Sequence, residues 1–170
     1  MIYLDLHGDP IPWKRPGHNS HTGAIYDEQK KLKEQCRWVL QAQYREDPLT
    51  CPLDIGMIFY FPISESTSAV KRTQMLNGVI HHMIKPDVDN LAKFALDTMT
   101  GVIFHDDCQV FRLSVEKRYS TKPGTYIQIN PLTCDVKKPV MINIDQTMTE
   151  RDTPKKSKDS DNNANDTGES

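Results

Sequence analysis

Residues 85–101 read KPDVDNLAKFALDTMTG and carry the clearest secondary-structure signal in the chain. Apolar residues recur there at intervals of three and four positions, which places them on one face of a helix. These apolar positions are Val88, Leu91, Ala92, Ala95, Leu96 and Met99. Gly101 follows at the place where helices commonly stop. The stretch therefore predicts a helix with one buried face.

On either side of this helix, alternating apolar residues predict strands and helical spacing predicts further helices. The expected strands cover residues 2–6, 53–61, 102–104, 111–115 and 125–129, and the expected helices cover 24–44 and a short part of 64–76. Pro62 closes one strand, and Lys122-Pro123-Gly124 forms a turn before the last strand. This order predicts an α+β fold in which helices pack on a mixed β-sheet.

The chain has 170 residues, with 21 Lys plus Arg against 23 Asp plus Glu, so a single domain of nearly neutral charge is expected. Residues 133–170 hold only eight of the apolar residues, and the last 20 hold one. A segment with so little to bury cannot offset the entropy of ordering it. We therefore expect residues 1–132 to form the domain and residues 133–170 to be a disordered C-terminal tail.

Several classes of protein are excluded by missing patterns. The chain has no apolar run of membrane-spanning length, and Met1–Asp5 does not begin a secretory signal, which predicts a cytoplasmic protein. It has no Walker loop, GxGxxG or HExxH motif, so we expect no nucleotide cofactor and no zincin chemistry. The scattered cysteines predict reduced thiols rather than a zinc site. They are Cys36, Cys51, Cys108 and Cys134.

Two acidic pairs stand out, Asp87/Asp89 at the predicted helix start and Asp106/Asp107 before the following strand. If the helix start and the strand start meet in space, these carboxylates converge and require a cation. Hard oxygen ligands of this kind suit Mg²⁺. The alternative is that the first pair caps the helix and the second forms a turn. Spacing alone does not decide between metal binding and capping.

Lys93 also has two interpretations. It follows Asp89 by four positions and precedes Asp97 by four, so the three side chains share one helix face. Lys93 is either a surface lysine paired with these acids or a cation that neutralises charge on a phosphate group.

The stretch Lys85-Pro86-Asp87-Val88-Asp89-Asn90-Leu91-Ala92-Lys93, then Asp97, Gly101 and Asp106-Asp107-Cys108-Gln109-Val110, carries a resemblance. It resembles the signature of the RusA family of Holliday junction resolvases. The likeness extends over residues 1–130, including Lys14-Arg15-Pro16 and Glu116-Lys117-Arg118-Tyr119, although only the acidic motif is specific. Residues 64–84 are longer than in the shortest family members, and the tail has no counterpart there.

The resemblance implies a RusA-like fold and a Mg²⁺-dependent endodeoxyribonuclease that resolves four-way DNA junctions in recombination and repair. It implies that Asp87, Asp89 and Asp107 bind the metal and act in catalysis, with Asp106 as an accessory ligand. Lys93 becomes the catalytic basic residue. Resolution into two duplexes needs paired symmetric nicks, which a twofold homodimer supplies.

A DNA-binding face is expected from the charge distribution. Residues 1–132 hold 15 basic and 15 acidic residues, and a metal would neutralise the four motif acids. The basic residues expected on that face are Lys14, Arg15, Lys71, Arg72, Lys85, Arg112, Lys117 and Arg118. Individually, each is also compatible with an ordinary solvated surface. Besides the junction endonuclease, two other interpretations remain: a non-catalytic branched-DNA-binding protein of the same fold, and an unrelated α+β protein.

Overall fold

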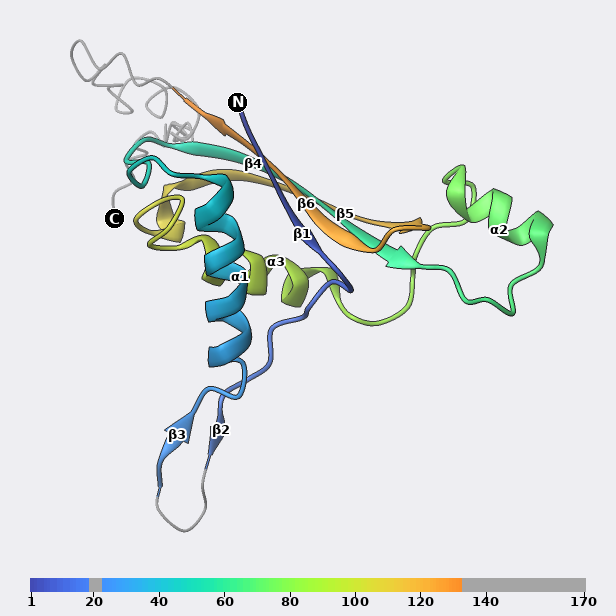
Figure 1. The fold of residues 1–170 in the computed structure, drawn as a ribbon, viewed down its shortest axis with the longest axis horizontal. Coiled ribbons are helices and arrows are strands. Elements are labelled where there is room, and N and C mark those ends of the chain that lie inside the picture. Colours follow the sequence, from blue (N-terminus) through green and yellow to red (C-terminus); the bar gives the residue numbers. More distant parts are fainter. Residues whose placement is uncertain (19–22, 133–170) are drawn as a thin grey trace, which may run out of the picture. The chain divides into compact units, whose positions relative to one another are not determined.

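The computed structural model describes residues 1–18 and 23–132 of the chain (Figure 1). The expected tail, including Cys134, lies outside the described residues, so its disorder and the domain boundary at Leu132 stay predictions. Cys36, Cys51 and Cys108 are free thiols, as predicted.

A four-stranded mixed sheet forms the centre of the fold. Its strands, in spatial order, are β1 (Ile2–His7), β6 (Gly124–Pro131), β4 (Leu53–Pro62) and β5 (Val110–Ser120). β6 pairs antiparallel with both β1 and β4, whereas β4 and β5 are parallel. Helices α1 (Lys30–Gln43) and α3 (Val88–Met99) lie on one side of this sheet, and the short α2 (Ala69–Leu76) lies beyond its end (Figure 1). The predicted α+β fold with a mixed sheet is confirmed.

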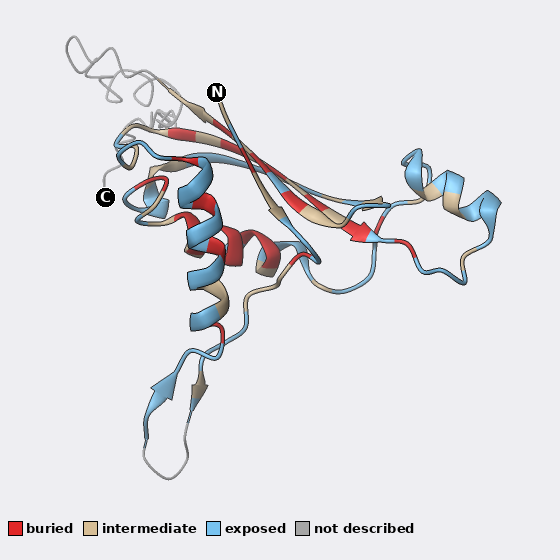
Figure 2. Cartoon of the chain, viewed as in Figure 1, coloured by how far each residue is buried: buried red, intermediate tan, exposed pale blue. Residues whose placement is uncertain are grey.

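The core lies between the sheet and the two longer helices. Alternate residues of β4 are buried, as the period of two predicts (Figure 2). These are Leu53, Ile55, Met57, Phe59 and Phe61. They belong to one core cluster with buried residues of α1 and α3. The opposite face of the sheet is less covered, and the rings of Tyr3 and Tyr126 stack on it with centroids 6.0 Å apart. The sheet thus has one buried face, and each side chain of β5 points either to this face or to the opposite one.

Helix α3 buries a wider face than its sequence pattern predicts. Leu91, Ala92, Ala95 and Met99 are buried as expected, and Phe94 is buried as well. The face is wider because α3 contacts both the sheet and α1. Val88 was expected in the buried stripe but is 41% exposed, since it is the first helical residue and projects past the core.

Two element predictions are wrong. The helix expected from Ala24 begins at Lys30, because Ile25–Tyr26 (β3) instead pairs with Gly17–His18 (β2) in a small hairpin. The strand expected over residues 102–104 is a turn, in which the Gly101 N–H donates to the Phe104 carbonyl at 2.7 Å. Gly101 adopts a φ of 79°, a conformation that favours glycine. Within the described part of the chain, two strands rather than three therefore follow α3.

No helix among residues 1–18 and 23–132 combines the length and the apolar character that crossing a membrane requires.

Candidate metal centre and nucleic-acid interface

The start of α3 presents two exposed carboxylates. Asp87 is the N-cap residue, with extended backbone (φ −72°, ψ 146°), and Asp89 lies in the first helical turn. The Asp87 carbonyl accepts the Leu91 N–H at 3.2 Å, but its side chain makes no capping hydrogen bond. Neither carboxylate forms an ion pair within residues 1–18 and 23–132. The capping interpretation therefore fails for this pair, and both carboxylates are free to bind a ligand.

Lys93 does not pair with the acids on its helix face. Its ammonium nitrogen lies 3.7 Å from the centre of the Trp13 ring, which is a cation–π contact. Asp97 is instead occupied by Lys33, whose Nζ lies 3.0 Å from its carboxylate. The interpretation of Lys93 as a surface lysine paired with Asp89 and Asp97 is therefore wrong, and its charge is held beside the free acids.

The loop that carries Trp13 is fixed to the rest of the protein by several hydrogen bonds. The Trp13 N–H donates to the Asn90 carbonyl at 2.8 Å, within the first turn of α3. The side chain of Gln29 is buried, accepts the Lys14 N–H at 2.6 Å and donates to the Pro12 carbonyl at 2.9 Å. Because these hydrogen bonds hold the loop independently of Lys93, the Trp13 ring is fixed in position for its contact with the Lys93 ammonium.

The second acidic pair behaves differently. The Asp106 carboxylate accepts the Cys108 N–H at 2.9 Å and caps the short 3₁₀ helix η1 (Asp107–Gln109). The Gln109 side chain completes a capping box by accepting the Asp106 N–H at 3.0 Å. The backbone N–H of Cys108 lowers the pKa of the Asp106 carboxyl. Capping is thus the correct interpretation for Asp106, whereas the exposed Asp107 carboxylate pairs with no basic side chain in the described chain.

Asp87 and Asp89 lie at the start of α3, whereas Asp106 and Asp107 follow the turn after its end. The helix start is beside the far half of β5, because Lys117 there hydrogen-bonds the Pro86 carbonyl. The helix end leads through the turn at Phe104 directly to η1 and to the beginning of β5. A helix of 12 residues is about 18 Å long. Accordingly, no group of three or more His, Cys, Asp or Glu side chains in the described residues could hold a metal ion. The predicted convergence of the two pairs does not occur within one chain.

The predicted DNA-binding residues fall into two groups. Lys14, Arg15, Lys71 and Lys85 are exposed, and their side chains make no ion pair in residues 1–18 and 23–132.

The other four are engaged within the protein. Arg112 Nη1 lies 3.3 Å from the Asp54 carboxylate, and Arg118 binds the Glu116 carboxylate through two nitrogens at 2.7 and 2.8 Å. Arg72 donates to the Ser64 carbonyl, and Lys117 donates to backbone carbonyls.

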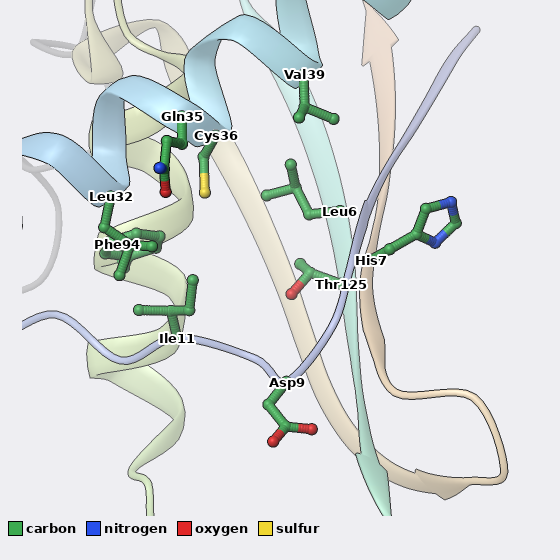
Figure 3. Close-up of a pocket in the computed structure, with 10 residues that line it drawn as sticks. All are labelled: Leu6, His7, Asp9, Ile11, Leu32, Gln35, Cys36, Val39, Phe94 and Thr125. Carbon is green, nitrogen blue, oxygen red and sulfur yellow. The ribbon is translucent and has the colours of Figure 1, made fainter.

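An apolar cavity of about 280 Å³ lies apart from the acidic residues, between β1, α1 and α3 (Figure 3). Leu6, Leu32, Cys36, Val39 and Phe94 line it. The His7 ring points away from it, and burial raises the pKa of the Cys36 thiol (Figure 3). The polar residues that line the cavity are His7, Asp9, Gln35 and Thr125.

Comparison with known proteins identifies the class to which this fold and these acids belong. Residues 7–130 match the family described as Endodeoxyribonuclease RusA, and the chain belongs to this family. The match spans both acidic pairs and Lys93, so the resemblance noted in the motif is confirmed. The chain is also similar to the uncharacterized protein YqaN of Bacillus subtilis (strain 168). The two are 28% identical over 138 residues, which cover 78% of this chain and 97% of that protein.

Proposed function

We propose that this protein is a Mg²⁺-dependent endodeoxyribonuclease that resolves four-way DNA junctions by paired symmetric nicks. The family match supports an endodeoxyribonuclease that acts on branched DNA. The observation that carries the proposal further is the pair of exposed carboxylates, Asp87 and Asp89, which have no internal partner at the start of α3. Two exposed carboxylates without internal partners can bind a cation without the loss of a native contact.

These two residues fit Mg²⁺ in particular. In proteins, Mg²⁺ is commonly bound by one or two carboxylates, with waters and substrate phosphate completing its octahedral shell. Asp87 and Asp89 supply that number of carboxylates from one rigid helix turn. When bound there, Mg²⁺ would polarise the scissile phosphate and supply a nucleophilic water.

Lys93 would neutralise negative charge that develops on the phosphate during cleavage. Its ammonium group is on the same helix as Asp87 and Asp89, and the Trp13 ring holds it there. The aromatic face attracts the charge without neutralising it, as a carboxylate would. Lys93 therefore keeps its full positive charge for the substrate.

We further propose that Asp107 completes the site of a second copy of this chain. Asp107 lies at the other end of α3 from Asp87 and Asp89, so it cannot join them within one chain unless the fold rearranges. A twofold dimer in which the end of α3 in one copy meets the start of α3 in the other would place all three acids together twice. Such a dimer also gives two sites, as paired nicks require.

Mixing two inactive variants tests this arrangement. In a heterodimer of Asp87→Asn with Asp107→Asn chains, a shared site would leave one composite site fully intact and the other doubly altered. We expect the mixture to regain nicking of a four-way junction, whereas each variant alone stays inactive. If each site were built within one chain, both sites would carry a defect and the mixture would stay inactive. A monomer at concentrations that support full cleavage would also contradict the proposal.

Contacts to the phosphate backbone of the junction are proposed for the predicted basic residues other than Lys117, beginning with those that have free side chains. Lys14, Arg15, Lys71 and Lys85 can bind phosphates without losing an internal ion pair. Arg112 and Arg118 would have to leave Asp54 and Glu116 first. Replacing one lysine or arginine of the first group by a neutral residue should weaken junction binding by a similar factor for all DNA sequences. It should also reduce the slope of log affinity against log salt concentration by about one.

The proposed activity is tested with a labelled four-way junction and a linear duplex of matched sequence, each incubated with Mg²⁺. We expect symmetric cleavage of the junction, an intact linear duplex and no cleavage by Asp87→Asn. The separation of the two acidic pairs within one chain favours one other candidate, a branched-DNA-binding protein without turnover. That candidate predicts junction binding but no cleavage, and an unrelated α+β protein would show neither.

A further inference from the structure

Lys117 occupies an unusual position for a residue expected to contact DNA. In the parallel pairing of β4 and β5 it lies opposite Phe59, which is buried, so Lys117 is on the sheet face that carries the helices. The adjacent Arg118 lies opposite Tyr60 and points to the other face. Lys117 is half-buried. The ammonium of a partly buried lysine is stabilised by hydrogen bonds to protein groups, which replace the water that burial removes.

Backbone carbonyls supply this replacement. Lys117 Nζ donates to the Ile84 carbonyl at 2.8 Å and to the Pro86 carbonyl at 3.0 Å. Hydrogen bonds from a charged donor are shorter and stronger than those between neutral groups. No carboxylate pairs with Lys117 in the described residues. Its bonds to the protein are thus made to the segment that leads into α3, and Pro86 directly precedes Asp87.

A second contact attaches the same segment to the sheet. His82 is 6% exposed, and its ring stacks on Phe61 at 4.0 Å and lies 5.0 Å from the ring of Tyr119. Burial and the nearby Lys117 ammonium lower the pKa of the His82 imidazole. Residues 82–86 are therefore held on β4 and β5 at three places: the ring of His82 and the carbonyls of Ile84 and Pro86.

Asp87 depends on this attachment because its own side chain has none. It makes no capping bond, and only its carbonyl is fixed by the helix, through Leu91. The backbone on either side therefore sets the position and the direction of its Cα–Cβ bond, from which the carboxylate reaches a ligand. The helix fixes one side, and Lys117 fixes the other.

We propose that Lys117 is a positioning residue that holds Asp87 in the geometry needed to bind a divalent cation, rather than a contact to the DNA backbone. This inference rests on the proposed metal site. Groups that orient metal ligands typically cost about 10- to 100-fold in metal affinity when they are removed. Lys117→Met keeps the length and the apolar stem of the side chain but removes both hydrogen bonds.

The test measures Mn²⁺ binding to the metal-free full chain by electron paramagnetic resonance, with Mn²⁺ standing in for Mg²⁺. We expect Lys117→Met to weaken Mn²⁺ binding about tenfold and to speed amide hydrogen exchange at Leu91, whose N–H bonds to the Asp87 carbonyl. Lys117→Arg, which keeps charged donors, should recover most of the affinity. Lys122→Met, on the exposed turn after β5, removes the same charge and should match the parent in both measurements.

Junction binding in EDTA at several salt concentrations separates positioning from DNA contact. Positioning predicts that Lys117→Met and Lys122→Met bind the junction with the same affinity and the same salt dependence. A selective loss of affinity in Lys117→Met, with a salt slope smaller by about one, would show a phosphate contact and overturn the inference.

The metal measurements separate this inference from the proposed function. If the parent binds Mn²⁺, if Asp87→Asn weakens that binding and if folded Lys117→Met does not, the inference alone is wrong. If the parent and Asp87→Asn bind Mn²⁺ equally or not at all, the proposed metal site fails and the inference fails with it. Should Lys117→Met not fold, Lys117→Arg and hydrogen exchange in the parent decide, since the inference requires the Leu91 N–H, which bonds to the Asp87 carbonyl, to be protected without metal.

Discussion

The two pairs of aspartates in this chain differ in how their side chains are used. At the start of α3, Asp87 is an N-cap residue whose carboxylate bonds to no backbone N–H. At η1, Asp106 is an N-cap residue whose carboxylate bonds to the Cys108 N–H in a full capping box. An aspartate that forgoes a favourable cap contributes little to the fold at that point. The comparison shows that the same residue type is structural at one end of α3 and available for ligands at the other.

The largest effect on cleavage is expected for Asp87→Asn. Cleavage of a four-way junction should fall by at least about 100-fold, because removal of a metal ligand exceeds the effect of altering the groups that orient it. The melting temperature should stay close to that of the parent, since no capping bond is lost. Cleavage rates and thermal unfolding of the same preparation check both expectations.

Asp47→Asn, an exposed aspartate after α1, is the matched control and should leave cleavage unchanged. An Asp87→Asn protein that melts far below the parent while cutting at the parental rate would reverse the comparison.

Asp107→Asn should separate binding from cutting. The change keeps the shape of the side chain and removes one negative charge, which weakens metal binding but eases repulsion of the DNA backbone. We expect junction binding equal to or tighter than that of the parent and a failure to cut the junction in Mg²⁺, because a direct metal ligand is lost. A gel shift and a cleavage assay on one preparation measure both, and cutting at the parental rate would end the assignment of Asp107 to the metal.

Trp13→Ala should reduce cleavage by an intermediate amount, through its effect on Lys93 in α3. A cation–π contact contributes about 0.5 to 2 kcal/mol, so cleavage should fall by roughly twofold to thirtyfold when Lys93 loses its contact with the Trp13 ring. Trp13→Phe keeps an aromatic face and should lose less. In a Trp38→Phe background, where Trp13 is the remaining tryptophan, Lys93→Met should also shift the fluorescence emission. Unchanged emission would contradict a Lys93–Trp13 contact in solution.

Asp106→Ala should have the smallest effect on cleavage and a clear effect on stability. It removes the bond to the Cys108 N–H, so the melting temperature should fall by a few degrees. Asp106→Asn keeps a capping oxygen and should melt near the parent. Because it also removes the charge, Asp106→Asn tests the remaining prediction that Asp106 is an accessory metal ligand: a loss of cleavage without a loss of stability would support that role.

Local patterns in the sequence predicted the elements whose burial is regular. The alternation in β4 and the stripe from Leu91 to Met99 each match one face of one element, because burial repeats with the geometry of the backbone. The pattern failed at Ile25, which pairs in a hairpin instead of extending α1, since strand pairing depends on a partner distant from the helical signal. The motif likewise identified the acids at the start of α3.

These local patterns did not predict how the helices and strands are placed relative to one another. Spacing placed Asp107 18 positions after Asp89, but it did not reveal that α3 and the following turn carry the two pairs to opposite ends of one helix. Nor could it distinguish Lys117 from Arg118, adjacent basic residues of which one faces the helices and the other bonds Glu116. Once the pairing of β4 with β5 is known, Lys117 lies opposite the buried Phe59 and Arg118 opposite Tyr60. Because side chains alternate along a strand, the two basic residues must then lie on different faces of the sheet.

The parallel pairing of β4 with β5 also determines when the site can form during folding. It joins Leu53 to Val110, about 57 residues apart, and α2, α3 and both acidic pairs lie within that span. Closing so long a loop costs entropy before any contact compensates for it, so such pairings form slowly. Lys117 is on the strand that closes the loop. On the ribosome, a chain that ends at Gln109 would contain every acid of the motif without β5, the strand that anchors Asp87, so an ordered site would appear only once nearly the whole described domain has been synthesised.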